Sequence, residues 1–109
     1  MQRTQEQIDQ IKMWISNKMV SEGITSNKLK KESIKIYNKT LVQMANYFSA
    51  QEFLPLVVVR KYIMMEFMTS ETSAKRYIDR IIYNNVFNYN IEQKIFYLHD
   101  DLLKKLSVA

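Results

Sequence analysis

The sequence predicts a mainly α-helical fold that carries one β-hairpin near its C-terminal end. Of the 109 residues only Gly23 is glycine and only Pro55 is proline, which excludes most tightly turned β architectures and every glycine-rich phosphate loop. Apolar residues recur at spacings of three and four along most of the chain, as in amphipathic helices. Over 86–91 the period changes to two, which is typical of a strand.

The first expected helix runs from about residue 4 to residue 22, where Gly23 supplies a left-handed stop. One face of this helix is an apolar stripe made of Ile8, Ile11, Trp14, Ile15 and Met19. A lone amphipathic helix buries such a stripe either on its own domain or against a twin helix of a second subunit. We expect the second arrangement, a homodimer formed through these five residues.

The second helix is expected over 28–50, with its buried stripe over 34–48. It follows three residues that are good helix N-caps, namely Thr25, Ser26 and Asn27. Its basic residues lie mostly off the stripe and are Lys28, Lys30, Lys31, Lys35 and Lys39. They carry much of the net charge of +5, because residues 1–50 have eight basic and four acidic side chains and residues 51–109 have eight and seven. The run is either the solvated face of an amphipathic helix or a surface that attracts a polyanion.

The third helix is expected over 56–67. Pro55 suits a first helical turn because its missing N–H has no partner there, so the three valines that follow are assigned to a helix although valines favour strands. Residues 51–54 are expected to form a connector. The methionines of this helix and its end are expected to fill the core; they are Met64, Met65 and Met68.

The fourth helix, expected over 71–84, has the clearest helical period. Its inner stripe consists of Ala74, Tyr77, Ile78 and Ile81, and opposite it stand Thr72, Lys75, Arg76, Asp79 and Arg80. Two aromatic segments, 86–91 and 95–98, then flank the polar turn Glu92-Gln93-Lys94 and predict the hairpin. A last short helix begins near residue 100, where Asp100 or Asp101 can cap it.

The segment 60–79 carries the functional signal, because it combines a helix, a short corner and a helix that opens Ser70-Glu71-Thr72-Ser73-Ala74-Lys75-Arg76-Tyr77-Ile78. This stretch resembles the helix-turn-helix of DNA-binding regulators, whose second helix often reads Ser-x-x-Thr-or-Ser-Ala-x-Arg-Tyr-aliphatic. The aromatic hairpin after it resembles the wing of the winged-helix subgroup. The resemblance covers 55–98 and implies a winged helix-turn-helix, a three-helix core plus a β-hairpin wing, here with an additional N-terminal helix. The corner holds Met68 and Thr69 where these proteins usually have a glycine and an aliphatic residue.

The resemblance also implies a function, sequence-specific binding of double-stranded DNA by a small transcriptional regulator that acts by occupying its site. Helix 71–84 would lie in the major groove. Its residues nearest the base edges would be Glu71, Thr72, Lys75 and Arg76, while Ser70, Ser73, Arg80 and, at the wing tip, Lys94 would hold phosphates. The alternative is a winged-helix module that binds proteins and no nucleic acid.

Other function classes find no support in the sequence. There are no cysteines and His99 is the only histidine, so we expect no metal site, no cofactor and no catalytic residues. No small-molecule ligand is evident. The N-terminus is polar and the longest apolar stretch is far too short to cross a membrane, so we expect a cytoplasmic protein without a membrane role. We divide the chain into a dimerising helix, 1–24, and a winged helix-turn-helix domain, 25–109.

Overall fold

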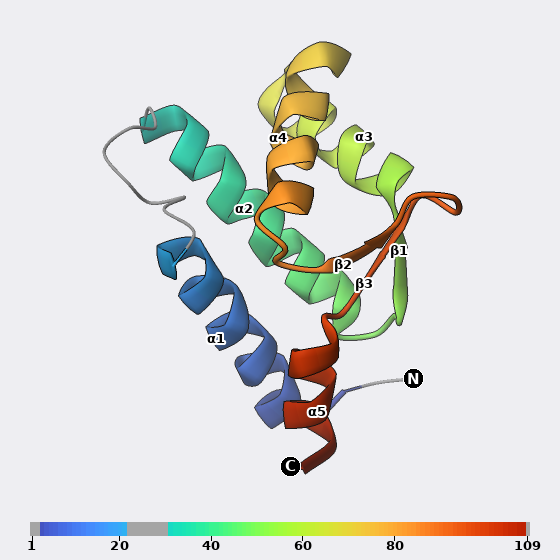
Figure 1. Ribbon diagram of the computed structural model, residues 1–109. Helices are drawn as coiled ribbons and strands as arrows, with labels where there is room; N and C mark the ends of the chain where they lie inside the picture. The colour runs from blue at the N-terminus through green and yellow to red at the C-terminus, as the bar shows by residue number, and fades with distance from the viewer. Residues whose placement is uncertain (1–2, 22–30, 109) are drawn as a thin grey trace.

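The protein is mainly helical and carries a small three-stranded antiparallel sheet, as seen in a computed structural model that describes residues 3–21 and 31–108. Its elements follow in the order α1 (Gln5–Ser21), α2 (Lys31–Phe48), β1 (Phe53–Pro55), α3 (Leu56–Phe67), α4 (Glu71–Tyr83), β2 (Asn88–Asn90), β3 (Ile95–Tyr97) and α5 (Asp100–Val108). Figure 1 shows α3 and α4 at one end of the molecule and α1 with α5 at the other. The expected stop at Gly23 and the expected caps Thr25, Ser26 and Asn27 lie outside the described residues.

The start of α1 is fixed by a reciprocal cap and by contacts to α2. The Thr4 hydroxyl accepts a hydrogen bond from the Gln7 backbone N–H at 3.2 Å, and the Gln7 side chain accepts one from the Thr4 N–H at 3.0 Å. Arg3 donates from Nε to the carbonyl of Phe48 at 2.8 Å, which satisfies a carbonyl at the C-terminal end of α2. Helices α1 and α2 are therefore antiparallel neighbours, although a segment that the structure leaves undescribed joins them.

The apolar stripe of α1 packs inside the chain instead of facing a second subunit. Ile11, Ile15 and Met19 are buried in the same hydrophobic cluster as residues of α2, α3, α4, β3 and α5. Trp14 is half-buried and donates from Nε1 to the Val86 carbonyl at 2.8 Å. Ile11, Ile15 and Met19 are therefore not available as the expected dimer interface, because their own chain covers them, whereas Ile8 and Trp14 keep partial exposure.

The short strand β1 was not expected, because residues 51–54 have no strand pattern of their own. It pairs antiparallel with β3 through the partners Leu54 and Phe96, so the sheet order is β1-β3-β2. Pro55 ends this edge strand, where a missing N–H breaks no ladder. The hairpin over β2 and β3 and the helix after Pro55 are confirmed.

Two local expectations are wrong. Met65 and Met68 do not fill the core, since 79% and 90% of their surface is exposed. Helix α5 is capped by His99 and not by an aspartate: the Leu103 N–H donates to the His99 carbonyl at 2.9 Å, and the Asp101 N–H donates to His99 Nδ1 at 3.2 Å.

Candidate nucleic-acid interface

The corner between α3 and α4 is fixed by one residue in left-handed backbone and one side-chain cap. Met68 ends α3 with φ 52° and ψ 42°. The Ser70 hydroxyl then accepts a hydrogen bond from the Ser73 backbone N–H at 3.2 Å and caps α4. The Thr69 hydroxyl donates to the Ile63 carbonyl at 3.4 Å, which ties the corner back to α3. The corner therefore forms without the glycine that the resemblance implies.

Helix α4 has one buried face and one open face. Ala74 and Ile81 are fully buried and Ile78 nearly so, which attaches the inner face to the core. The outer face is exposed and polar, and its exposed members are Glu71, Thr72, Lys75, Arg76, Asp79, Arg80 and Tyr83. The first two turns thus present a lysine and an arginine to solvent, as a helix that enters a nucleic-acid groove requires.

Six of the eight expected DNA-binding residues border two hollows on either side of α4. Ser73, Arg76 and Arg80 border the first, and Glu71, Lys75 and Lys94 border the second. Lys94 therefore borders a hollow beside α4 although it comes from the turn between β2 and β3. Ser70, at the corner, and Thr72, in the first turn of α4, border neither hollow.

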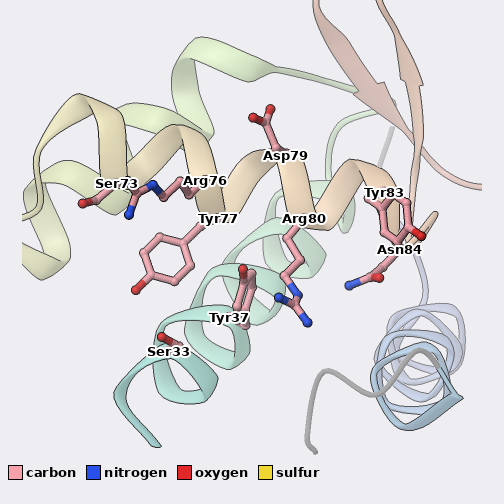
Figure 2. A pocket seen from close by; sticks show the side chains of 9 residues that line it. All are labelled: Ser33, Tyr37, Ser73, Arg76, Tyr77, Asp79, Arg80, Tyr83 and Asn84. Carbon is pink, nitrogen blue, oxygen red and sulfur yellow. The ribbon is translucent and has the colours of Figure 1, made fainter. Parts of the chain in front are cut away.

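The first hollow, which we call the α2–α4 groove, is an open groove of about 1010 Å³ lined by Ser33 and Tyr37 of α2 and by Ser73, Arg76, Tyr77 and Arg80 of α4. Figure 2 shows Arg80 extending from α4 toward α2 and Asp79 pointing to the opposite side. The rings of Tyr37 and Tyr77 meet edge to face, with centroids 5.0 Å apart. The groove therefore combines arginines, hydroxyls and an aromatic wall, which suits an anionic and partly planar ligand such as a nucleic-acid strand.

Sequence reasoning missed Tyr37 as a groove residue and assigned it to the buried stripe of α2. Both descriptions hold, because only 4% of its surface is exposed while it still lines the groove. Burial raises the pKa of the Tyr37 phenol to about 12, although the positive charge of the nearby Arg80 guanidinium acts in the opposite direction and lowers it. Its hydroxyl is therefore protonated at neutral pH.

The charge of the outer face of α4 is mixed. It carries three basic and two acidic side chains. Glu71 pairs with Arg60 of α3, with Nη1 and Oε1 3.7 Å apart and both side chains at least a third exposed, so this ion pair contributes little stability. Asp79 borders both hollows and no ion pair involves it in the described ranges.

The described part of the lysine run lies on the solvent side of α2. Lys31, Lys35 and Lys39 follow one another at steps of four and are exposed, opposite the buried stripe. Lys39 borders a small hollow with Tyr62 of α3 and neither hollow beside α4. Lys28 and Lys30 lie outside the described residues.

Within the described ranges, 3–21 and 31–108, no group of three or more His, Asp or Glu side chains is arranged to hold a metal ion. Every helix in them is too short or too polar to cross a bilayer. His99 is occupied as the cap of α5 and packs on Trp14, with ring centroids 5.2 Å apart.

Comparison of the chain with protein-family models, with curated proteins and with solved structures finds no match.

Proposed function

We propose that the chain is a winged helix-turn-helix protein that binds double-stranded DNA in a sequence-specific way and regulates transcription by occupying its site. The observation that carries this proposal is the open outer face of α4, whose first two turns expose Thr72, Lys75 and Arg76 while Ala74 and Ile78 hold the inner face to the core. An α-helix fits the major groove, which is about 12 Å wide.

The order of the elements supports the same proposal. A short strand precedes α3, the corner at Met68 leads into α4, and the hairpin of β2 and β3 follows and pairs with that first strand. In a winged helix this arrangement puts the recognition helix and the wing on one side. Lys75 and Lys94 border one hollow here, so both can meet the same duplex.

The proposed roles follow from position on α4. Thr72, Lys75 and Arg76 meet base edges, where an arginine can bond a guanine with two hydrogen bonds. Arg80 and the amides at the capped start of α4 hold phosphates, as does Lys94 from the hairpin. Glu71 remains near the base edges, but its pairing with Arg60 at 3.7 Å reduces its availability.

The test is selection of bound fragments from a random duplex pool, followed by fluorescence anisotropy on the selected site. Arg76→Ala should cost about 1–3 kcal/mol of specific binding if Arg76 makes a bidentate base contact, and should relax the preference at one position. Lys35→Ala removes an exposed charge on α2, so it should weaken binding less and equally on all sequences.

Lys61→Ala is the matched control, because Lys61 is exposed on α3 and borders neither hollow. We expect it to bind like the parent protein. If the pool yields no preferred site, or if Arg76→Ala and Lys61→Ala bind alike, the proposed reading face is wrong.

The second candidate is a winged-helix module that binds a protein. It is favoured by exposed apolar side chains on the outer side of α3, where Val58 is 40% and Met65 is 79% exposed. Salt separates the two, because DNA affinity falls steeply between low and moderate salt with a slope set by the phosphate contacts. The protein-binding module would show no duplex binding even at low salt.

A further inference from the structure

A second hollow beside α4, which we call the hairpin pocket, lies between α3, α4 and the turn of the β2–β3 hairpin. Its volume is about 490 Å³, within the range of about 300–1,000 Å³ that is usual for small-molecule sites. It is smaller than the α2–α4 groove and has an apolar floor and a charged rim.

The floor is made of apolar side chains from α3, α4 and β2. Leu56 comes from the start of α3, Ile82 from the last turn of α4 and Tyr89 from β2, and each is half-buried. The Tyr89 ring packs on Phe96, with centroids 4.9 Å apart, so it is held in place from behind. Val57 borders the floor and is 41% exposed. An apolar body placed here would cover surface that the chain itself leaves in water.

The turn that closes the pocket is tied to α3 before any ligand binds. The Leu56 backbone N–H donates to the Lys94 carbonyl at 2.9 Å, and the Lys94 N–H donates to the Asn90 carbonyl at 2.8 Å. Lys94 holds this position in left-handed backbone, with φ 54°. A pocket whose wall is fixed in this way loses little entropy when it binds a ligand.

The rim carries more positive than negative charge that is open to a ligand. Its cations are Arg60, Lys75 and Lys94 and its carboxylates are Glu71 and Asp79. Arg60 and Glu71 are paired with each other at 3.7 Å, whereas no ion pair involves either lysine among the described residues. Once Arg60 and Glu71 are paired, the rim has two positive side chains, Lys75 and Lys94, and one negative side chain, Asp79. Its net charge of one positive unit is complementary to a ligand with a single negative charge.

We propose that the hairpin pocket binds a small amphipathic carboxylate, with its apolar body on Leu56, Ile82 and Tyr89 and its carboxylate between Lys75 and Lys94. The floor selects for an aliphatic or aromatic body, and a bare inorganic anion would leave it uncovered. Such a ligand would engage two cations that the proposed DNA complex also uses. It would therefore weaken DNA binding, a consequence that rests on the proposed function, and DNA would weaken the ligand by the same factor.

Binding is tested by titrating the methyl-labelled protein with 4-phenylbutyrate and following methyl NMR shifts. We expect shifts of Leu56, Val57 and Ile82 and none of Leu102 or Leu106, which lie in α5. 4-Phenyl-1-butanol has the same body without the charge and should bind about tenfold more weakly, since charge-assisted hydrogen bonds are lost. Inorganic phosphate should leave the floor methyls unmoved. Equal affinity for acid and alcohol, or no shift of floor methyls at millimolar acid, would overturn the proposal.

Two neighbouring valines supply a matched pair of variants. Val57 borders the pocket and Val58 does not, and their exposed fractions are 41% and 40%. Val57→Trp should fill the pocket and weaken binding of the acid at least tenfold, whereas Val58→Trp should leave it unchanged. Unshifted methyls of Leu102 and Leu106 in both variants show that the fold is kept. Equal affinity of the two variants would count against the pocket.

The charge and the coupling to DNA are tested separately. The double variant Lys75→Gln, Lys94→Gln should bind the acid only as weakly as the alcohol, and its affinity for the alcohol should be unchanged. If the variant loses affinity for both compounds, the assigned role of the lysines is wrong. Added acid should lower the affinity for the selected duplex, and unchanged affinity at saturating acid would disprove the coupling. If no duplex binds at all, the proposed function fails, and the methyl titration still decides on the pocket.

Discussion

Replacing Met68 by glycine should stabilise the protein, although it removes a large side chain. Met68 ends α3 in left-handed backbone, with φ 52° and ψ 42°. In this region the Cβ atom of any L-residue crowds the neighbouring carbonyl, while glycine has no Cβ. The substitution therefore tests whether the backbone strain at this corner is larger than the stabilisation that the Met68 side chain provides.

The magnitude follows from burial and backbone geometry. Met68 is 90% exposed, so its truncation removes almost no buried apolar surface. Relief of the left-handed strain is worth about 1–2 kcal/mol. Against this, glycine gives the unfolded chain more freedom, which costs about 0.4–1 kcal/mol. We therefore expect the free energy of unfolding to rise by about 0.5–1 kcal/mol, or the melting temperature by about 2–5 °C.

The assay is urea unfolding followed by circular dichroism, with Met65→Gly as the control. Met65 is also an exposed methionine, at 79%, but it lies inside α3 with helical backbone. Glycine there should lower the free energy of unfolding by about 0.8–1 kcal/mol, because it weakens a helix interior. Opposite signs for the two variants support the reasoning. If Met68→Gly destabilises the protein as Met65→Gly does, the left-handed position holds no strain that glycine can relieve.

Three further predictions concern buried or half-buried polar groups, and urea unfolding measures all of them. Burial raises the pKa of Tyr37 from 10.0 to about 12, so its contribution to stability is complete below pH 10 and is lost as pH rises toward 12. Tyr37→Phe should reduce this loss of unfolding free energy between pH 10 and 12. If the loss is the same in the variant, Tyr37 is not its source. The Thr40 hydroxyl is buried without a hydrogen-bond partner, so Thr40→Val should be neutral or stabilise by up to about 1 kcal/mol, and a clear loss would point to a bond not seen here. Trp14→Phe removes the 2.8 Å bond to the Val86 carbonyl and should cost about 1–3 kcal/mol, whereas a cost near zero would mean that water replaces it.

The helices were predictable because each has a local period, and the strand β1 was not because it has none. Pro55 set the start of α3 strongly enough to outweigh the three valines after it. The three residues of β1 instead owe their conformation to β3, which pairs with them from about forty positions further along the chain. No spacing within 51–54 carries that information, so the third strand was missed.

For the candidate site, local sequence predicted which residues of α4 face outward but not what lies beside them. Lys75 and Arg76 are exposed as their spacing indicates, yet they border different hollows. Lys75 shares its hollow with Lys94, and Arg76 shares its groove with Tyr37, because tertiary packing brings separate segments together. The same limit explains α1: an apolar stripe shows that a face is buried, but not whether its own chain or another covers it.

Asp79 restricts how a duplex could approach α4. It lies three residues after Arg76 on the outer face and borders both hollows, so it occupies the ridge between them. A carboxylate on that ridge repels phosphates, but it can accept a hydrogen bond from the amino group of cytosine. In the proposed complex the ridge therefore meets base edges together with Lys75, and the backbone is met on the flanks by Arg80 on one side and by Lys94 on the other. These two flanking cations contribute about −2 to the salt slope. A carboxylate seated between Lys75 and Lys94 would remove one of these phosphate contacts and one base contact, so that a ligand in the hairpin pocket would reduce the salt dependence of DNA binding together with its affinity.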